Sequence, residues 1–165
     1  MANKCHYEMK IKGSKESVQT FIRYAEATYY IAGNKIVSDD DRYFFGMEVE
    51  EKSEREVEGM TDEVVATIKG YCRWSIHSCL FEGIHTSFSD YQKRCENFRG
   101  ITLLEASETL GVTVEVYSAE TDFMEHFLVK NGELLIEDCF DDYQSIEDEE
   151  DGWIETGGVE WNFSF

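Results

Sequence analysis

The chain of 165 residues contains no proline, and after Lys130 it contains no lysine or arginine. Without proline it has no proline-rich linker and no proline-dependent docking motif. It has no continuous apolar run of about 18 residues, so the sequence predicts no membrane-spanning helix. The first residues lack the apolar stretch of a secretion signal, and we therefore expect the protein in the cytoplasm of a cell or of an infected host cell.

Several motifs that mark chemical sites are also missing. Neither a Gly-x-Gly-x-x-Gly pattern nor a P-loop occurs, so nothing in the sequence supports nucleotide binding. The formal net charge of −20 would repel nucleic acid and anionic membranes, which argues against direct contact with either. Among 35 acidic residues, no pair stands out for acid–base catalysis.

Acidic residues dominate the end of the chain. Twelve Asp or Glu residues lie between Asn131 and Phe165, and they account for more than half of the net charge. Aromatic and aliphatic residues are interleaved with them, whereas disordered acidic tails are poor in aromatics. We therefore expect this region to fold and to hold its carboxylates in place. A folded surface of one sign attracts a surface of the opposite sign, which indicates a basic partner rather than a reaction.

A second acidic run lies earlier in the chain. Its glutamates fall on even positions, which on a regular strand would place them all on one face. They are Glu48, Glu50, Glu54, Glu56 and Glu58. Such a row is often only a solvated sheet face, but the total charge exceeds what solubility requires.

Hydrophobic periodicity predicts an alternation of strands and helices. Helices are expected over 14–30, with Ser14 as N-cap, and over 102–110, with a capping box and a stop at Gly111. Strands are expected over 6–11, 45–50, 64–80, 112–117 and 158–165, and Asn131-Gly132 predicts a hairpin between 124–130 and 133–137. This order predicts a single α+β domain over 1–165 with a ferredoxin-like split βαβ sandwich: an antiparallel sheet, two main helices and an acidic C-terminal β extension over 133–165.

Five cysteines in a chain without a secretion signal favour reduced thiols over disulfides. If 64–80 is a strand, His77 and Cys79 lie on one face, close enough to share a metal. The candidate zinc ligands are Cys5, Cys72, His77 and Cys79. Because the paired cysteines of most zinc sites are absent, buried thiols beside a hydrogen-bonded histidine are the competing interpretation, and no cofactor other than this structural zinc is suggested.

A nucleophilic Cys–His pair is a further alternative, with Cys72 or Cys79 beside His77, His85 or His126. Such a pair needs direct contact, a lowered thiol pKa and an oxyanion site. The sequence supplies none of these, so we predict a protein without enzymatic activity.

Several segments resemble a known family. Cys72–Ser75, Ser78–Phe81, Leu103–Val112, Glu115–Glu120 and Phe123–His126, followed by Asn131-Gly132, are similar to the YubB-type ferredoxin-like proteins of phages and plasmids. The first residues, Met1–Cys5, and the helix start Gly13–Val18 are similar too. The resemblance implies a ferredoxin-like domain and a mobile-element origin, and it implies no established reaction and no catalytic residues.

A small, very acidic protein of this origin fits the class of counter-defence inhibitors that includes anti-CRISPR proteins. The leading hypothesis is a non-enzymatic binding protein that docks on a basic nucleic-acid-binding protein, for example a CRISPR effector nuclease, and acts as a nucleic-acid mimic that blocks nucleic-acid loading. The candidate contact residues are Glu137, Asp138, Asp141, Asp142, Tyr143, Glu147, Asp148, Glu149, Glu150, Asp151 and Trp153. The alternatives are a small zinc-binding protein and a phage accessory domain whose acidity only aids solubility.

Overall fold

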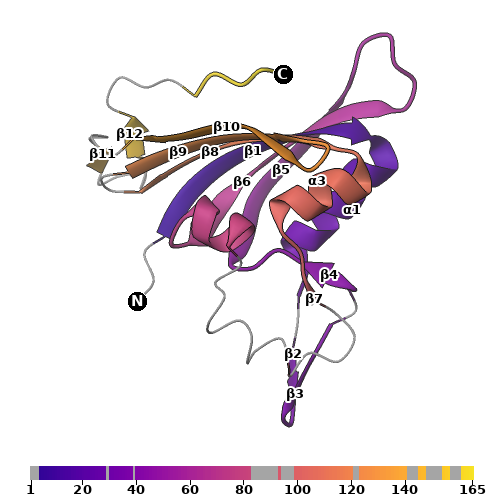
Figure 1. The fold of residues 1–165 in the computed structure, drawn as a ribbon, viewed down its shortest axis with the longest axis vertical. Coiled ribbons are helices and arrows are strands. Elements are labelled where there is room, and N and C mark those ends of the chain that lie inside the picture. Colours follow the sequence, from indigo (N-terminus) through magenta and orange to yellow (C-terminus); the bar gives the residue numbers. More distant parts are fainter. Residues whose placement is uncertain are drawn as a thin grey trace.

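A six-stranded sheet forms the centre of the computed structural model (Figure 1), which describes residues 4–28, 30–38, 40–82, 93, 99–120, 123–140, 145–147, 154–156 and 161–165. Its strand order is β10-β9-β8-β1-β6-β5, and every neighbouring pair is antiparallel. The strands are β1 (Lys4–Ser14), β5 (Met47–Glu56), β6 (Glu63–Arg73), β8 (Thr113–Glu120), β9 (Phe123–Lys130) and β10 (Glu133–Phe140). The helices α1 (Lys15–Glu26) and α3 (Leu103–Leu110) lie on one face of this sheet (Figure 1), so the predicted α+β class with an antiparallel sheet is confirmed.

The main core lies between the sheet and the two helices. On β1, every second residue is buried and the residues between them are partly exposed, which is the alternation of a half-buried strand. The same period appears on most of β6. Among the buried core residues are Tyr7, Met9, Ile11, Phe21, Ile68, Leu103 and Val116. Burying each such side chain contributes about 1.5–3 kcal/mol, so the alternation fixes which sheet face the helices cover.

The first helix begins where predicted and ends earlier. The Ser14 side chain accepts a hydrogen bond from the Ser17 backbone N–H at 3.2 Å, which caps α1 as expected. The helix stops at Glu26, because Ala27 leaves the helical conformation with φ −53° and ψ 128°. The chain then forms β2 (Tyr30–Ala32), which pairs with β3 (Lys35–Val37). Residues 33–34 therefore close a small hairpin.

The predicted strand over 64–80 is wrong beyond Arg73. Trp74 has φ 68°, a left-handed conformation that costs a bulky residue about 1 kcal/mol and cannot continue a strand. The chain then enters η1 (His77–Phe81), a short π-helical turn. The buried Glu125 carboxylate on β9 accepts hydrogen bonds from the backbone N–H groups of Ile76 (2.9 Å) and His77 (3.4 Å). A side chain far away in sequence thus binds the first amides of the turn that replaces the strand.

From α3 to β10 the local features of the chain follow the sequence prediction closely. The Thr102 side chain accepts from the Glu105 backbone N–H at 3.2 Å and the Glu105 carboxylate accepts from the Thr102 backbone N–H at 3.0 Å, which is the predicted capping box. Gly111 ends α3 with φ 66°. Asn131 and Gly132 have φ 51° and 76° and join β9 to β10. Positive φ at both turn residues is what a tight hairpin of this kind requires.

The acidic run on β5 does not line one face. Its register with β6 shifts between Val49 and Glu51, so Glu50 is the extra residue of a β-bulge. As a result Glu48 and Glu51 share one face, while Glu54 and Glu56 lie on the other.

The remaining strands are short. β4 (Arg42–Tyr43) pairs in parallel with β7 (Arg99–Gly100), and β11 (Ser145–Glu147) pairs antiparallel with β12 (Ile154–Thr156). Residues 161–165 cross the sheet face opposite the helices without forming a strand (Figure 1). The predicted strand over 158–165 is therefore wrong for 161–165, and 158–160 lie outside the described residues. No helix of the described ranges is long and apolar enough to cross a membrane.

Candidate functional site

The structure places two of the predicted contact residues in full. Glu137 and Asp138 are both exposed on β10, opposite Phe127 and His126 of β9. Consecutive strand residues point to opposite faces, so Glu137 lies on the helix-covered side of the sheet and Asp138 on the other. Asp138 Oδ2 is 3.8 Å from His126 Nδ1. β10 is an outermost strand of the sheet, which leaves both carboxylates at an accessible edge.

The other predicted contact residues follow β10. Glu147 is the last residue of β11, and only its backbone is described. The remainder lie outside the described residues: Asp141, Asp142, Tyr143, Asp148, Glu149, Glu150, Asp151 and Trp153. Within the predicted extension over 133–165, the acidic side chains that the structure describes are therefore those of β10.

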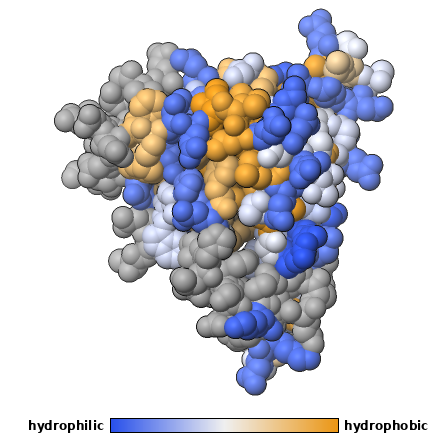
Figure 2. Space-filling model, in the orientation of Figure 1, coloured by the Kyte–Doolittle hydropathy of each residue, from blue (hydrophilic) through white to orange (hydrophobic). Residues whose placement is uncertain are grey.

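An apolar area begins on the same strand. Leu134, Leu135 and Ile136 follow one another at the start of β10, and Leu135 is 53% exposed. Figure 2 shows this hydrophobic area over β10, continuing toward the helices and framed by hydrophilic residues. We call these three residues the β10 apolar edge. The sequence predicts them only as part of a hairpin strand, although three consecutive aliphatic residues on a strand bounded by acids signal an exposed apolar edge.

A buried polar network attaches the C-terminal segment to the sheet. The Glu115 carboxylate is fully buried and accepts hydrogen bonds from the Ser164 backbone N–H (2.6 Å) and the Ser164 hydroxyl (3.2 Å). His126 Nε2 lies 2.9 Å from the same carboxylate. Tyr117 stacks on the His126 ring with centroids 3.9 Å apart, and its hydroxyl donates to the Asn162 carbonyl at 2.9 Å. A buried carboxylate requires such partners, so this network has a structural role.

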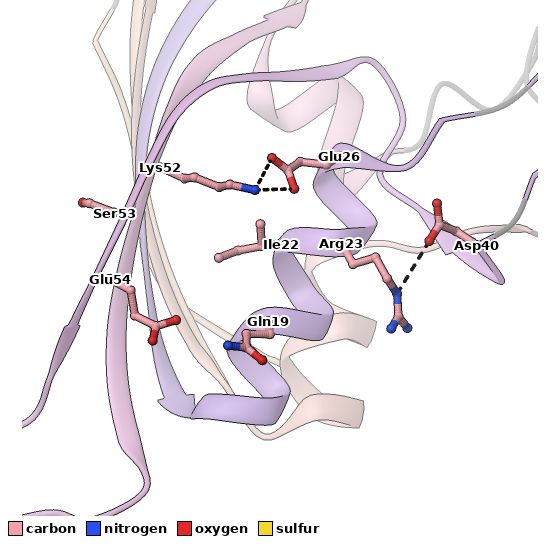
Figure 3. Close-up of a pocket in the computed structure, with 8 residues that line it drawn as sticks. All are labelled: Gln19, Ile22, Arg23, Glu26, Asp40, Lys52, Ser53 and Glu54. Carbon is pink, nitrogen blue, oxygen red and sulfur yellow. Dashed lines mark hydrogen bonds and ion pairs between the residues drawn. The ribbon is translucent and has the colours of Figure 1, made fainter.

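Burial shifts the pKa of two groups near this end of the sheet. Burial, followed by the nearby Glu115 charge, raises the pKa of Tyr117. Burial also raises the pKa of Glu125, although hydrogen bonds from Ser118 and from the backbone of Ile76 and His77 act in the opposite direction. Neither group lines the groove of Figure 3. The hydrogen bonds that Glu125 accepts show that it caps η1.

Three of the four predicted zinc ligands do lie together. Cys5 and Cys72 are directly opposite each other on β1 and β6, Cys79 comes from η1, and all three are buried. Hydrogen bonding with the Cys5 and Cys79 thiols, followed by burial, raises the pKa of Cys72. This keeps the Cys72 thiol protonated, whereas both metal binding and nucleophilic attack need the thiolate.

The fourth predicted ligand points elsewhere. The His77 ring stacks on Phe81, and its Nδ1 is 3.5 Å from Glu82 Oε1. No three His, Cys, Asp or Glu side chains in the described part of the chain are arranged to hold a metal ion. Two other histidines were candidates for a nucleophilic pair. His126 is hydrogen-bonded to Glu115, and residue 85 lies outside the described residues.

A groove of about 470 Å³ separates α1 from β5 (Figure 3). Lys52 Nζ bridges both oxygens of Glu26 at 2.9 and 3.0 Å, and Arg23 Nε lies 3.6 Å from Asp40 Oδ1. Figure 3 shows Ile22 pointing from α1 toward β5, beside the Lys52–Glu26 pair, whereas Arg23 and Asp40 lie on the other side of the helix. Ligand sites are usually apolar with a few converging polar groups, whereas most of the residues lining this groove are charged or polar, so we assign it no function.

Comparisons with protein-family models, with curated proteins and with solved structures found no match to this chain.

Proposed function

We propose that this protein is a non-enzymatic, acidic binding protein that docks on a basic nucleic-acid-binding protein and blocks nucleic-acid loading. A CRISPR effector nuclease is the kind of partner that fits. We further propose that β1–α1–β5–β6–α3–β8 is a ferredoxin-like split βαβ core, in which β9 and β10 extend the sheet. We also propose a phage or plasmid origin, which the YubB-type resemblance implies, and action in the cytoplasm of the infected cell.

One observation carries the proposal: the charge of residues 131–165 has a single sign. From Asn131 to Phe165 the chain has twelve acidic and no basic residues, and the exposed Glu137 and Asp138 present that charge on both faces of an edge strand. The opposite edge, β5, is also charged, but Lys52 and Arg55 lie among its glutamates. Mixed charge on an edge strand is a common protection against aggregation, whereas charge of one sign directs a partner.

Carboxylates can occupy the positions of phosphates on a basic surface. Lys and Arg make charge-assisted hydrogen bonds to either group, and a partner that uses these side chains for nucleic acid cannot bind both at once. Such contacts weaken with ionic strength, because salt screens exposed charges over about 10 Å at moderate concentration. We therefore expect steeply salt-dependent binding and direct competition with nucleic acid.

The first test is capture of partners from a nuclease-treated host lysate at low and moderate salt, read by mass spectrometry. We expect one dominant basic nucleic-acid-binding protein that is lost as salt rises. That protein, once purified, should lose its nucleic acid when this protein is added. Recovery of no partner at low salt would contradict the proposal and favour acidity that serves solubility only.

A charge-reversal pair locates the contact. One variant converts acids of the C-terminal region to lysine, and the control converts an equal number on β5 and in the turn that follows it, so both change the net charge equally. The first set is Glu137, Asp138, Glu147, Asp148 and Glu149, and the control set is Glu50, Glu51, Glu54, Glu56 and Glu58. We expect the first variant to lose binding and the control to lose much less. Equal losses would mean that only total charge matters, and no loss in either would refute electrostatic docking.

A further inference from the structure

The two edges of the sheet are built differently. β5 ends the sheet on one side with exposed charged residues from Glu50 onward. β10 ends it on the other side, and three consecutive aliphatic residues follow its first residue, Glu133. Edge strands normally carry charge because an apolar edge attracts other chains. The β10 apolar edge departs from that rule, whereas the other edge strand, β5, follows it.

A β-bulge directs the central residue of this edge outward. The register between β10 and β9 pairs Leu134 with Val129 and then Ile136 with Leu128, so Leu135 has no opposite residue. Leu134 packs partly against the main core, whereas Leu135 is 53% exposed. Bulges of this kind re-aim a side chain. Here the bulge turns a leucine toward solvent.

Carboxylates bound the apolar edge along the strand. Glu133 precedes it and Glu137 and Asp138 follow it, and all three are exposed. On the helix side, Glu108 of α3 approaches the β9–β10 turn, where its Cβ would lie 3.0 Å from a side-chain carbon added at Gly132. An apolar centre with a polar rim is the usual layout of a protein-binding surface, and this rim favours a positively charged partner.

A second copy of the chain fits this edge poorly. Two β10 edges in contact would bring the rim carboxylates of both copies together, and each copy carries a net charge of −20. Like charges at short range oppose such a contact. A segment with apolar side chains flanked by lysine or arginine meets both parts of the surface.

We propose that the β10 apolar edge is the anchor point of the docking surface and that it takes a basic partner segment with apolar side chains, with Leu135 as the central contact. This inference rests on the proposed function and adds to it the place and the chemistry of the contact. The carboxylates supply attraction and salt dependence, and Leu135 supplies the apolar contact that distinguishes a matching partner from a simple polycation.

Two labelled peptides of equal length test this in fluorescence anisotropy: one of alternating leucine and lysine, and one of lysine only. The variants are Leu135→Ser and, as a control, Tyr30→Ser, which removes a 61% exposed apolar side chain from the β2–β3 hairpin. We expect the alternating peptide to bind more tightly, and Leu135→Ser to weaken it about tenfold. Tyr30→Ser should leave it unchanged, and neither variant should alter binding of the lysine-only peptide. Amide NMR shifts on binding should centre on 134–137.

The outcomes separate the two proposals. If neither peptide binds at low salt, the proposed electrostatic function fails. If both bind equally and Leu135→Ser has no effect, that function stands and the apolar anchor is refuted. If sedimentation shows a dimer that Leu135→Ser dissociates, a second copy occupies the edge and the partner assignment is wrong.

Discussion

Glu125 is the side chain whose replacement tests the structure most sharply. Its carboxylate accepts hydrogen bonds from the backbone N–H of Ile76 (2.9 Å), the Ser118 hydroxyl (2.9 Å) and the backbone N–H of His77 (3.4 Å). Glu125→Ala removes the acceptor for all three donors, and the bonds from Ile76 and Ser118 are fully buried. An unsatisfied buried donor costs about 1–3 kcal/mol. We therefore expect Glu125→Ala to lower the free energy of unfolding by about 2–6 kcal/mol.

Glu125→Gln should behave differently, because it keeps the shape and one acceptor oxygen. Burial raises the pKa of Glu125, so the folded protein binds a proton on this carboxylate more tightly than the unfolded chain does. In an unfolded chain the pKa of a glutamate is about 4.3. The stabilisation from protonation is fully present below that pH and is lost as pH rises through the raised folded pKa. Glutamine does not titrate. Relative to Glu125→Gln, the wild type should therefore lose stability as pH rises from about 4, by at most about 1.4 kcal/mol per pH unit.

Urea unfolding of the wild type and both variants across this pH range measures the effect, with Glu137→Gln as control. Glu137 is exposed on β10, and its replacement changes the net charge by the same amount without touching the hydrogen bonds of Glu125, so it isolates the effect of net charge. If the wild type instead gains stability over Glu125→Gln as pH rises, the three hydrogen bonds outweigh burial and the reasoning is wrong. A loss below about 1 kcal/mol for Glu125→Ala would show that η1 does not depend on this cap.

Three further predictions concern other parts of the molecule. Gly70→Ala should destabilise the protein by about 3 kcal/mol in urea unfolding, because the added carbon would lie 1.9 Å from the Glu48 carbonyl oxygen. In the control Gly59→Ala the added carbon has open space, and only the φ of 80° disfavours a side chain, so it should cost about 1 kcal/mol. Equal costs for the two variants would contradict the close contact between β5 and β6 at Gly70. Deleting 161–165 removes both Ser164 hydrogen bonds to Glu115 and should lower thermal stability by about 2 kcal/mol or more, whereas an unchanged melting temperature would show that the segment is not anchored. Elemental analysis of protein prepared with added zinc should give far less than one equivalent, and a full equivalent would revive the zinc hypothesis.

The local features of the fold were readable from the sequence, because each depends on residues close together in the chain. The Ser14 cap, the capping box of α3, the stop at Gly111 and the Asn131-Gly132 turn are all formed within a few residues. The alternating pattern of β1 likewise marked the buried face of the sheet. The acidic character of residues 131–165 is composition alone and needed no structure.

The tertiary structure decided what depends on partners far away in sequence. The strand that ends at Arg73 is followed by η1 because Glu125, about fifty positions later, binds the amides of Ile76 and His77. The C-terminal segment lies along the sheet because Glu115 accepts its hydrogen bonds. The bulges on β5 and β10 are set by the register with a neighbouring strand. The bulge on β5 decides which glutamates share a face, and the bulge on β10 turns Leu135 toward solvent. Periodicity assumes an unbroken strand, so only the paired strands reveal where that assumption fails.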